Sequence, residues 1–235
     1  MCGRYSLATN EFSQIQLQFK VEAKLELSPR YNIAPTWNAG YEPPIVFQNA
    51  RGERELGLAR WWMIPSTWQR PLSGLPTAFN ARAEELEQKR FWSQAFASRR
   101  CLVPSTGWRE FNGQRGQRQA FQFHYDHALF AFAGIWDAWV SPEGAHVQSF
   151  AIVTVAANEM VSPIHDRMPL SVAPAFYSEW LDPNVSGARA LSRVRSATAP
   201  PLFRYEANPR GNDVRFEGPE AIAPLPAAQL GLFRS

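Results

Sequence analysis

The sequence has only two cysteines and no long hydrophobic run. Cys2 and Cys101 cannot build a disulfide framework, so we expect a reducing, cytoplasmic setting. No apolar stretch approaches the roughly 18 residues that a membrane-spanning helix needs. The first residues also lack the basic and apolar segments of a secretory signal. We therefore expect neither a membrane protein nor a small secreted domain held by disulfides.

Lysine is also scarce. It occurs only at Lys20, Lys24 and Lys89, so arginine supplies the other 21 of the 24 basic residues. With 21 acidic residues, the formal net charge is only +3. The planar guanidinium of arginine suits phosphate groups and base edges better than the lysine ammonium does. A GC-rich, bacterial coding bias would produce the same excess, so the composition is compatible with nucleic-acid binding without establishing it.

The composition and the hydrophobic pattern predict one α+β domain over residues 1–235. Hydrophobic residues make up 45% and charged residues 19%, which predicts a packed core. Helical periodicity predicts helices over residues 12–19 together with the residues that follow, over residues 80–100 and over residues 173–181. Alternating, aromatic-rich segments predict strands of one large, curved antiparallel sheet over residues 100–111, 119–125, 128–140 and 149–157. The proline-rich end, residues 218–235, is expected to lie over the surface, with 225–235 as an extended tail.

The chain begins "MCGRYS", which places a thiol at the second residue, where chains are normally flexible. Methionine aminopeptidases remove Met1 when the second residue is small. Cys2 would then carry an α-amine and a thiol on neighbouring carbons, and both groups ionise not far from neutral pH. Such a pair condenses with an aldehyde to an imine, and the thiol then closes a five-membered thiazolidine. Position alone also permits an incidental cysteine.

Two other side chains could move protons. His165 lies in the loop "SPIHDRMP" after a predicted strand, and histidine titrates in the range that acid–base catalysis needs. The alternative is that its ring hydrogen-bonds a loop carbonyl. Glu110, in "STGWREF", lies among aromatic residues, which raise the pKa of a carboxyl group and suit it to proton transfer. The alternative is a solvated carboxylate at a strand end.

Asn80 and Arg82 lie at the predicted start of a helix. A helix N-terminus with an arginine nearby favours anions such as phosphate, although Asn80 could equally be an ordinary N-cap. In "RWWMIPSTW", the side chains of Trp61, Trp62 and Trp68 could stack on bases where they are exposed. Because most tryptophans belong to protein cores, we expect one of the three to be exposed.

The sequence predicts no metal site and no cofactor. His124 and His127 are spaced like metal ligands, but on a strand they would point to opposite faces. Two cysteines without a matching carboxylate pair do not complete a zinc site. No glycine-rich phosphate loop is present. Cys101 falls in a predicted strand and is expected to be a buried, inert thiol.

Several short motifs follow one another along the chain: "MCGRY", "YNIAPT", "WWMIPSTW", "FNARAE", "GWREF", "IHDRMP" and "NDVRFEGPE". Together they resemble the SOS-response-associated peptidase (SRAP) family, whose members shield abasic sites. The resemblance extends from residue 2 to about residue 224. It implies a compact α+β fold with a barrel-like, largely antiparallel sheet flanked by helices, and a positively charged cleft.

In that family, the mature N-terminal cysteine forms a thiazolidine with the ring-opened sugar of an abasic site in single-stranded DNA. The resemblance makes Cys2 the nucleophile and lets Asn80 orient its α-amine. Glu110 would handle protons during ring opening and imine chemistry. His165 would exchange a proton with the sugar and assist both formation and reversal of the crosslink. The implied DNA contacts are Arg4, Arg82, Arg90 and Arg167 at phosphates, and Pro35, Trp68, Phe111 and Thr154 along the cleft.

The resemblance also implies the setting of the reaction. The expected partner is single-stranded DNA with abasic sites, and no metal, membrane or cofactor takes part. We expect a monomer in a bacterial cytoplasm, associated with the nucleoid. Removal of Met1, by autoproteolysis or by an aminopeptidase, would precede the reaction, and strand cleavage by lyase chemistry could accompany it.

The sequence departs from the family pattern on both sides of Glu110. The family has an aromatic residue before this glutamate and a tryptophan after it, whereas this chain has Arg109 and Phe111. Arg109 would either pair with Glu110 and lower its pKa or, by strand alternation, point to the opposite face. "PSTW" is one residue longer than the common "PSW", which leaves the position of Trp68 open.

Two alternative functions remain open. The first is a thiol peptidase, or autopeptidase, that uses Cys2, His165 and Glu110, although no oxyanion-hole sequence is recognisable. The second is a non-catalytic module that binds single-stranded DNA or modified bases. Both alternatives predict that a blocked α-amine leaves the activity intact, whereas the crosslinking hypothesis predicts its loss.

Overall fold

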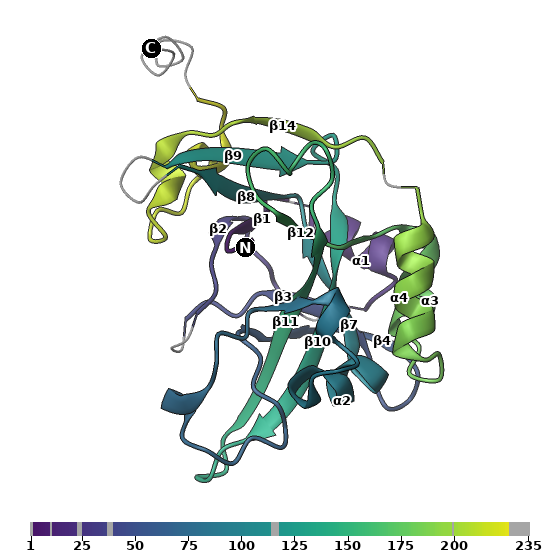
Figure 1. The fold of residues 1–235 in the computed structure, drawn as a ribbon. Helices are drawn as coiled ribbons and strands as arrows, with labels where there is room; N and C mark the ends of the chain where they lie inside the picture. The colour runs from purple at the N-terminus through teal and green to yellow at the C-terminus, as the bar shows by residue number, and fades with distance from the viewer. Residues whose placement is uncertain are drawn as a thin grey trace.

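Two β-sheets meet where the chain passes from one to the other at residues 105–107 (Figure 1). The computed structural model describes residues 2–9, 11–22, 25–36, 40–113, 118–198 and 200–225. The predicted α+β class is confirmed for these residues. The predicted tail lies outside the described residues from residue 226 onward.

The larger sheet is antiparallel along its main path and carries three short additional strands. The path runs β12 (Arg167–Pro169), β11 (His146–Ala156), β10 (Phe130–Val140), β7 (Arg100–Ser105), β3 (Pro44–Gln48) and β4 (Arg54–Leu58). The additional strands are β13 (Ser171–Val172) on β10, and β5 (Arg60–Trp61) and β6 (Asn80–Arg82), both parallel to β11.

The smaller sheet is antiparallel throughout. Its order is β14 (Phe203–Glu206), β9 (Gln119–His124), β8 (Gly107–Asn112), β1 (Tyr5–Leu7) and β2 (Arg30–Ile33). The expectation of one large sheet is therefore wrong. Pairing among the described strands gives two open sheets, and the expected barrel-like closure is not confirmed.

A tight crossing at Thr106 separates the sheets. The Ser105 hydroxyl donates to the Ser6 carbonyl oxygen (3.1 Å), and the Gly107 N–H donates back to Ser105 Oγ (3.2 Å). A Cβ at Gly107 would lie 2.7 Å from the Phe123 carbonyl oxygen, so only glycine allows this approach of β8 to β9. The crossing directs β7 and β8 into different sheets, which the alternating pattern alone does not reveal.

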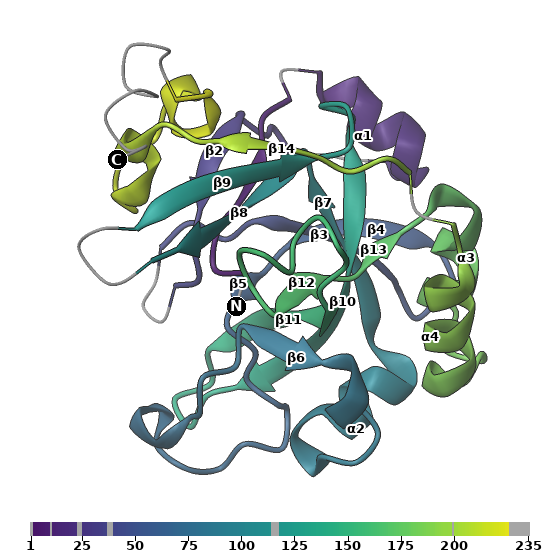
Figure 2. The same cartoon turned by 45° about the horizontal axis from the view of Figure 1, so that its top comes forward.

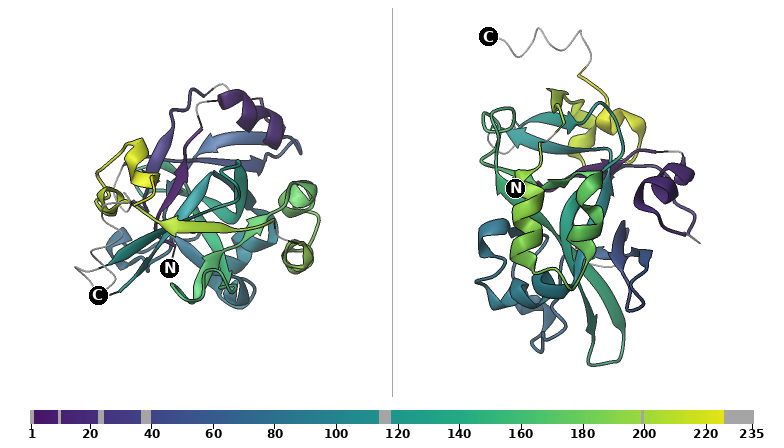
Figure 3. Two further views of the ribbon diagram at one scale, coloured as in Figure 1. Left: turned by 90° about the horizontal axis from the view of Figure 1, so that it is seen from above. Right: turned by 90° about the vertical axis from the view of Figure 1, so that its right-hand side faces the viewer.

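Helices lie along the outside of the sheets, and Figure 3 shows α3 and α4 side by side. The α-helices are α1 (Phe12–Phe19), α2 (Arg90–Ser98), α3 (Tyr177–Leu181) and α4 (Gly187–Ser196). Short 3-10 helices are η1 (Leu72–Gly74), η2 (Ala83–Glu85), η3 (Pro174–Phe176), η4 (Pro209–Asn212) and η5 (Pro219–Ile222).

The predictions for the first and last helical segments have different outcomes. The helix predicted from residue 12 is confirmed as α1, which ends at Phe19 and not in the residues that follow. Ile15 and Phe19, one turn apart, are both buried. The segment 173–181 forms η3 and α3, whereas α4 and β14 were not predicted. The expectation that residues 218–225 drape over the surface is wrong. Ala221 and Leu225 are buried, and Pro224 forms a β-bridge with Ala207.

The helix predicted over residues 80–100 is wrong in its first half. Asn80 is not an N-cap but the first residue of β6, opposite Ile152 of β11. The Ile152 N–H donates to the Phe79 carbonyl oxygen (3.0 Å), so pairing with β11 outweighs the local helix propensity. Only residues 90–98 form the α-helix. This shift turns Asn80 from a helix cap into a residue of the sheet.

Large aromatic side chains fill the space between the two sheets. Trp61 and Trp108 are fully buried, and the ring of Tyr5 meets Trp61 edge to face at 5.0 Å. The Trp61 indole N–H donates to the Phe79 carbonyl oxygen (2.8 Å), which satisfies its polar atom inside the core. Cys101 is also buried, and burial raises the pKa of its thiol well above the ordinary value. The expectation of a buried Cys101 is confirmed.

Arg100 joins the ends of two helices to the larger sheet. It is the first residue of β7, and it is 1% exposed. Its guanidinium donates to five backbone carbonyl oxygens, those of Phe96 (2.8 Å), Ala97 (2.7 Å), Trp180 (2.6 Å), Val185 (2.9 Å) and Asp182. These carbonyls belong to the ends of α2 and α3 and to the loop that follows, where helix carbonyls lack partners within the helix.

Arg100→Met should therefore lower the free energy of unfolding by about 3–5 kcal/mol, because buried carbonyl groups lose a charged donor. Urea unfolding measures the change. Arg189→Met is the matched control, since Arg189 lies on α4, is exposed, and its side chain forms a surface ion pair with Glu179. The control should change the stability by no more than about 0.5 kcal/mol. Equal losses in the two variants would contradict this role of Arg100.

Candidate active site

The start of the chain is held inside the protein. Cys2 is 0% exposed, and Asn80 donates from Nδ2 to its carbonyl oxygen at 2.8 Å. The Cys2 thiol lies 3.6 Å from the Arg4 carbonyl oxygen, to which it donates. Burial raises the pKa of this thiol well above the ordinary value, and the negative charge of Glu110 raises it further. Figure 2 shows the N-terminal end of the chain close to β6, which carries Asn80.

Glu110 projects from β8 and is 2% exposed. Burial is the main cause that raises the pKa of its carboxyl group to about 8; the charge of the amino terminus lowers it and Asp166 raises it by smaller amounts. Its Oε1 is buried and has no hydrogen-bond partner among the described residues. A carboxyl group in this state is largely protonated at neutral pH and can both give and take a proton.

Arg109 does not neutralise Glu110. Its Nη1 donates to Asn212 Oδ1 (3.3 Å), and no ion pair joins the two neighbours. Successive side chains of a strand point to opposite faces, so β8 presents the carboxyl group on one face and the guanidinium on the other. Of the two alternatives for Arg109, the geometry therefore matches the second, and the pKa of Glu110 is raised rather than lowered.

His165 lies in the loop between β11 and β12. Its Nδ1 accepts a hydrogen bond from the Arg167 N–H (2.9 Å), so the neutral ring carries its proton on Nε2. Asp166 Oδ1 also lies 2.9 Å from Nδ1, and this carboxylate is mostly exposed. Burial is the main cause that lowers the pKa of His165, and the charge of the amino terminus lowers it further. A neutral imidazole of this kind can accept a proton near neutral pH.

The structure links these residues through different kinds of contact. Asn80 bonds directly to Cys2, and Glu110, once ionised, raises the pKa of the Cys2 thiol through its negative charge. Asn80 Oδ1 is a second buried acceptor without a partner in the part of the chain that the structure describes. Two unpartnered acceptors therefore belong to the residues that interact with the chain start.

The four arginines predicted to bind phosphates differ in how exposed their side chains are and in how many contacts these already make. Arg82 is exposed and lies 3.7 Å from one oxygen of Glu85, and Arg90 is exposed at the start of α2. Arg167 is engaged by both oxygens of Glu84 (3.2 and 2.8 Å) and by a backbone carbonyl at 2.6 Å. Arg4 is partly exposed and donates to a backbone carbonyl at 3.5 Å.

The other predicted DNA contacts are partly or wholly covered. Pro35 and Phe111 are half-buried, so each keeps some surface for contact. Thr154 is buried, and its hydroxyl donates to the Ala81 carbonyl oxygen at 3.5 Å across the β6–β11 pair. In the described structure, Thr154 supports the strand that carries Asn80 and presents almost no surface.

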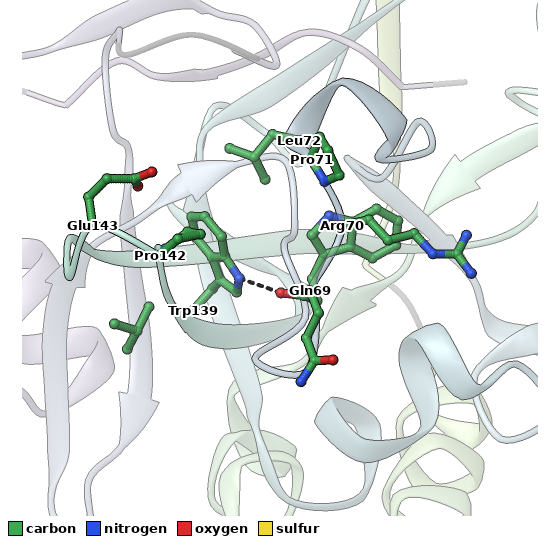
Figure 4. A pocket seen from close by; sticks show the side chains of 9 residues that line it. Gln69, Arg70, Pro71, Leu72, Trp139, Pro142 and Glu143 are labelled. Carbon is green, nitrogen blue, oxygen red and sulfur yellow. Dashed lines mark hydrogen bonds between the residues drawn. The ribbon is translucent and has the colours of Figure 1, made fainter.

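Trp68 lies in a separate pocket of about 530 Å³ (Figure 4). The Trp139 indole N–H donates to the Trp68 carbonyl oxygen (2.8 Å), which ties the loop before η1 to the end of β10. The pocket lining consists of Trp68, Gln69, Arg70, Pro71, Leu72, Trp139, Val140, Pro142 and Glu143. None of the four predicted catalytic residues lines it. The structure therefore does not join Trp68 to the group around Cys2.

Sequence reasoning missed the role of two asparagines. Asn32 in β2 donates from Nδ2 to the carbonyl oxygens of Asp213 (2.8 Å) and Phe216 (3.0 Å). Asn212 accepts from both Arg4 and Arg109. The motifs "YNIAPT" and "NDVRFEGPE" contain these asparagines, but a single sequence does not show that the two motifs touch.

The two histidines that we expected on opposite faces lie together. The rings of His124 and His127 are stacked, with centroids 3.8 Å apart and an angle of 14° between the planes. β9 ends at His124, and positive φ angles at Asp126 (49°) and His127 (55°) turn the chain back.

No cluster of three or more metal-ligating side chains occurs within the described ranges. Nor does any described helix have the length and apolarity to cross a membrane.

Comparison with known proteins identifies the family. The profile of the family described as SOS response associated peptidase (SRAP) matches residues 1–212. The chain belongs to the SRAP family. Among curated SRAP relatives, the abasic site processing protein YoqW of Bacillus subtilis (strain 168) is 31% identical, over 94% of this chain and 99% of that protein. The abasic site processing protein YedK of Escherichia coli (strain K12) is 26% identical, over 96% and 100%.

Solved structures show the same fold. A protein from Bacteroides thetaiotaomicron superimposes with a TM-score of 0.81 at 20% identity, covering 96% of this chain and 100% of that one. At this identity the likeness concerns the SRAP fold alone. It agrees with the α+β arrangement of Figure 1.

The raised pKa of Glu110 predicts a pH-dependent stability. Between about pH 4.5, the ordinary value, and about pH 8, the unfolded chain releases this proton while the folded protein keeps it. The free energy of unfolding should therefore fall as the pH rises through this window. Glu110→Gln lacks this contribution, so its stability relative to the parent protein should increase from pH 5 to pH 8. Urea unfolding of both proteins across this pH range measures the difference in free energy of unfolding, with the exposed Glu87→Gln as control. Parallel pH profiles of the parent protein and Glu110→Gln would contradict the raised pKa of Glu110.

Proposed function

We propose that this chain captures abasic sites in single-stranded DNA covalently, through the α-amine and the thiol of Cys2 after Met1 has been removed. The observation that carries the proposal is the hydrogen bond from Asn80 Nδ2 to the Cys2 carbonyl oxygen (2.8 Å). It holds the second residue beside the side chain of Asn80. The charge of ionised Glu110 raises the pKa of the Cys2 thiol. The names of the relatives, abasic site processing proteins, support the same substrate.

The proposed reaction begins with the ring-opened aldehyde of the abasic sugar. The α-amine nitrogen of Cys2 adds to the aldehyde carbon, and the loss of one water gives an imine. The sulfur then adds to the same carbon, the thiol proton is released, and the nitrogen regains a proton. The products are one thiazolidine and one water. Since amine and thiol are on neighbouring carbons, ring closure is intramolecular, which compensates for the small fraction of thiolate.

Three neighbours would assist this chemistry. The unpartnered Oδ1 of Asn80 would accept an N–H of the freed α-amine and direct its lone pair to the aldehyde. Glu110, with a pKa of about 8, would protonate the carbinolamine hydroxyl, which leaves as water, and would then accept the thiol proton. The neutral ring of His165 would exchange a proton with the sugar hydroxyl during ring opening and during reversal.

DNA would be held mainly through its backbone. Arg82 and Arg90 are exposed and can meet phosphates directly, whereas Arg167 would have to exchange its bond to Glu84. Phosphate contacts give affinity without sequence preference, and the half-buried Phe111 offers a ring on which any base can stack. Such recognition suits a lesion that lacks its base. Strand cleavage by a lyase route would follow where the imine eliminates before the ring closes.

A thiol peptidase that uses Cys2, His165 and Glu110 is the second candidate, favoured by the description of the family. A peptidase nucleophile needs a lowered thiol pKa. Burial and the charge of Glu110 instead raise the pKa of Cys2. A raised thiol pKa favours the route in which the amine attacks first. In this route, removal of Met1 is the step that frees the α-amine of Cys2.

The two cysteines allow a matched test of the nucleophile. Cys2→Ala should abolish the heat-stable adduct with single-stranded DNA that contains one abasic site, because ring closure needs the sulfur. Cys101→Ala should retain it, since Cys101 is buried in β7 and takes no part. Denaturing gels after heating measure the adduct, and borohydride should still trap an imine with Cys2→Ala. A heat-stable adduct of equal yield in both variants would end the thiazolidine proposal.

A second test concerns the amine. Protein that retains Met1, identified by its mass spectrum, or processed protein with an acetylated α-amine should give no adduct, because the first bond forms at the α-amine of Cys2. The thiol-peptidase and simple-binding alternatives predict that peptide cleavage or DNA binding survives the same block. Undiminished crosslinking by the blocked protein would refute the proposed order of steps.

A further inference from the structure

Arg4 and Arg109 bring two guanidinium groups together on one face of the smaller sheet. The Arg109 N–H donates to the Arg4 carbonyl oxygen (3.0 Å), which continues the pairing of Tyr5 with Trp108. Arg4 and Arg109 are therefore cross-strand neighbours, whose side chains lie on the same face. Arg109 is 3% exposed, whereas Arg4 is partly exposed. One cation of the pair lies inside the protein and the other reaches the surface.

The described residues offer this pair few acceptors. Arg4 Nη2 donates to the Asn212 carbonyl oxygen at 3.5 Å, and Arg109 Nη1 donates to Asn212 Oδ1 at 3.3 Å. Both distances are at the long end of the range for hydrogen bonds. Arg4 Nε and Arg109 Nη2 are buried with no acceptor within the described chain. Two charged donors are thus left without a partner at one place.

The charge of the pair is compensated only in part. No carboxylate of the described chain forms an ion pair with either guanidinium. Asp213 attracts Arg4, but both its oxygens are bound by Arg215, at 3.1 and 2.9 Å. Burial and repulsion by Arg4 lower the pKa of Arg109 to about 10, so this group keeps its charge at neutral pH. Two like charges in a partly buried place are stabilised by an anion.

The segment that covers the pair is fixed in place. Gly211 packs directly on the Arg109 guanidinium, and a Cβ there would lie 2.6 Å from the Ala221 carbonyl oxygen. Asn32 holds the same segment through hydrogen bonds to the carbonyl oxygens of Gly211 (3.2 Å) and Asp213 (2.8 Å). The unpaired donors therefore belong to an ordered site and not to a mobile surface.

We propose that Arg4 and Arg109 together form a binding site for one phosphate group, with Arg109 as an inner guanidinium that no assigned contact includes. The chemistry of the site selects a tetrahedral oxyanion, because Arg forks bind phosphate oxygens through several donors. As the source we infer a backbone phosphate of the bound DNA, and this part rests on the proposed function. Free inorganic phosphate has the same chemistry and is distinguished below.

The first experiment uses inorganic phosphate and no DNA. The Tm of the full chain is measured in rising phosphate at constant ionic strength, balanced with chloride, and should increase to a plateau. Arg109→Met should lose this increase or need at least about tenfold more phosphate for half of it, as expected for loss of a charged donor. Arg210→Met is the control, because Arg210 lies on the same segment, is exposed and contacts Glu220 (3.7 Å).

The control should respond to phosphate like the parent protein. An unchanged phosphate response in Arg109→Met would overturn the site. If Arg109→Met does not fold, Arg109→Lys replaces it, because lysine keeps the charge but lacks the fork. Arg109→Lys should need a higher phosphate concentration for half of the increase, and an unaltered concentration would again overturn the site.

The second experiment identifies the source of the phosphate. Single-stranded DNA with one abasic site is prepared as a series in which one phosphate at a time is a neutral methylphosphonate. For the parent protein, one position should slow adduct formation several-fold; for Arg109→Met the same position should have no further effect. A phosphate response without any sensitive position supports the site and overturns DNA as its source. If the parent protein forms no adduct with any DNA, the proposed function fails, while the Tm experiment still tests the site.

Discussion

The hydrogen bond between the Asn80 side chain and the Cys2 carbonyl oxygen holds a part of the chain that would otherwise fray. It exists only because β6 joins β11 in parallel register, which presents the amide of Asn80 to the chain start. With this contact, a terminus becomes part of the core, and Cys2 is fully buried. The acid–base roles that we propose for Glu110 of β8 and for His165 of the β11–β12 loop depend on this fixed point.

Strand alternation in β8 separates two electrostatic environments within one peptide unit. Glu110 faces the interior, where burial keeps its carboxyl group largely protonated. Arg109 faces the covering segment at Gly211 and shares that place with Arg4. Had both side chains lain on one face, they would have paired, and the carboxyl group would have lost its raised pKa. A carboxyl group with a raised pKa and a cationic pair can therefore be neighbours in sequence without cancelling each other.

Local sequence patterns predicted the elements whose stability is local. The helical periodicity of the segment from residue 12 predicted α1, and the alternating segments predicted β7 to β11. The family resemblance supplied the group around Cys2, whereas propensity misplaced Asn80 on a helix because pairing with β11 is a long-range effect. The division into two sheets depends on the close approach at Gly107, which no periodicity encodes. The Arg4–Arg109 pair likewise depends on contacts with the distant residue Asn212.

Complete burial of the second residue has a consequence for how this protein is made. Cys2 is synthesised before Asn80, Glu110 and His165, so the contacts that bury it can form only after these later residues have been made.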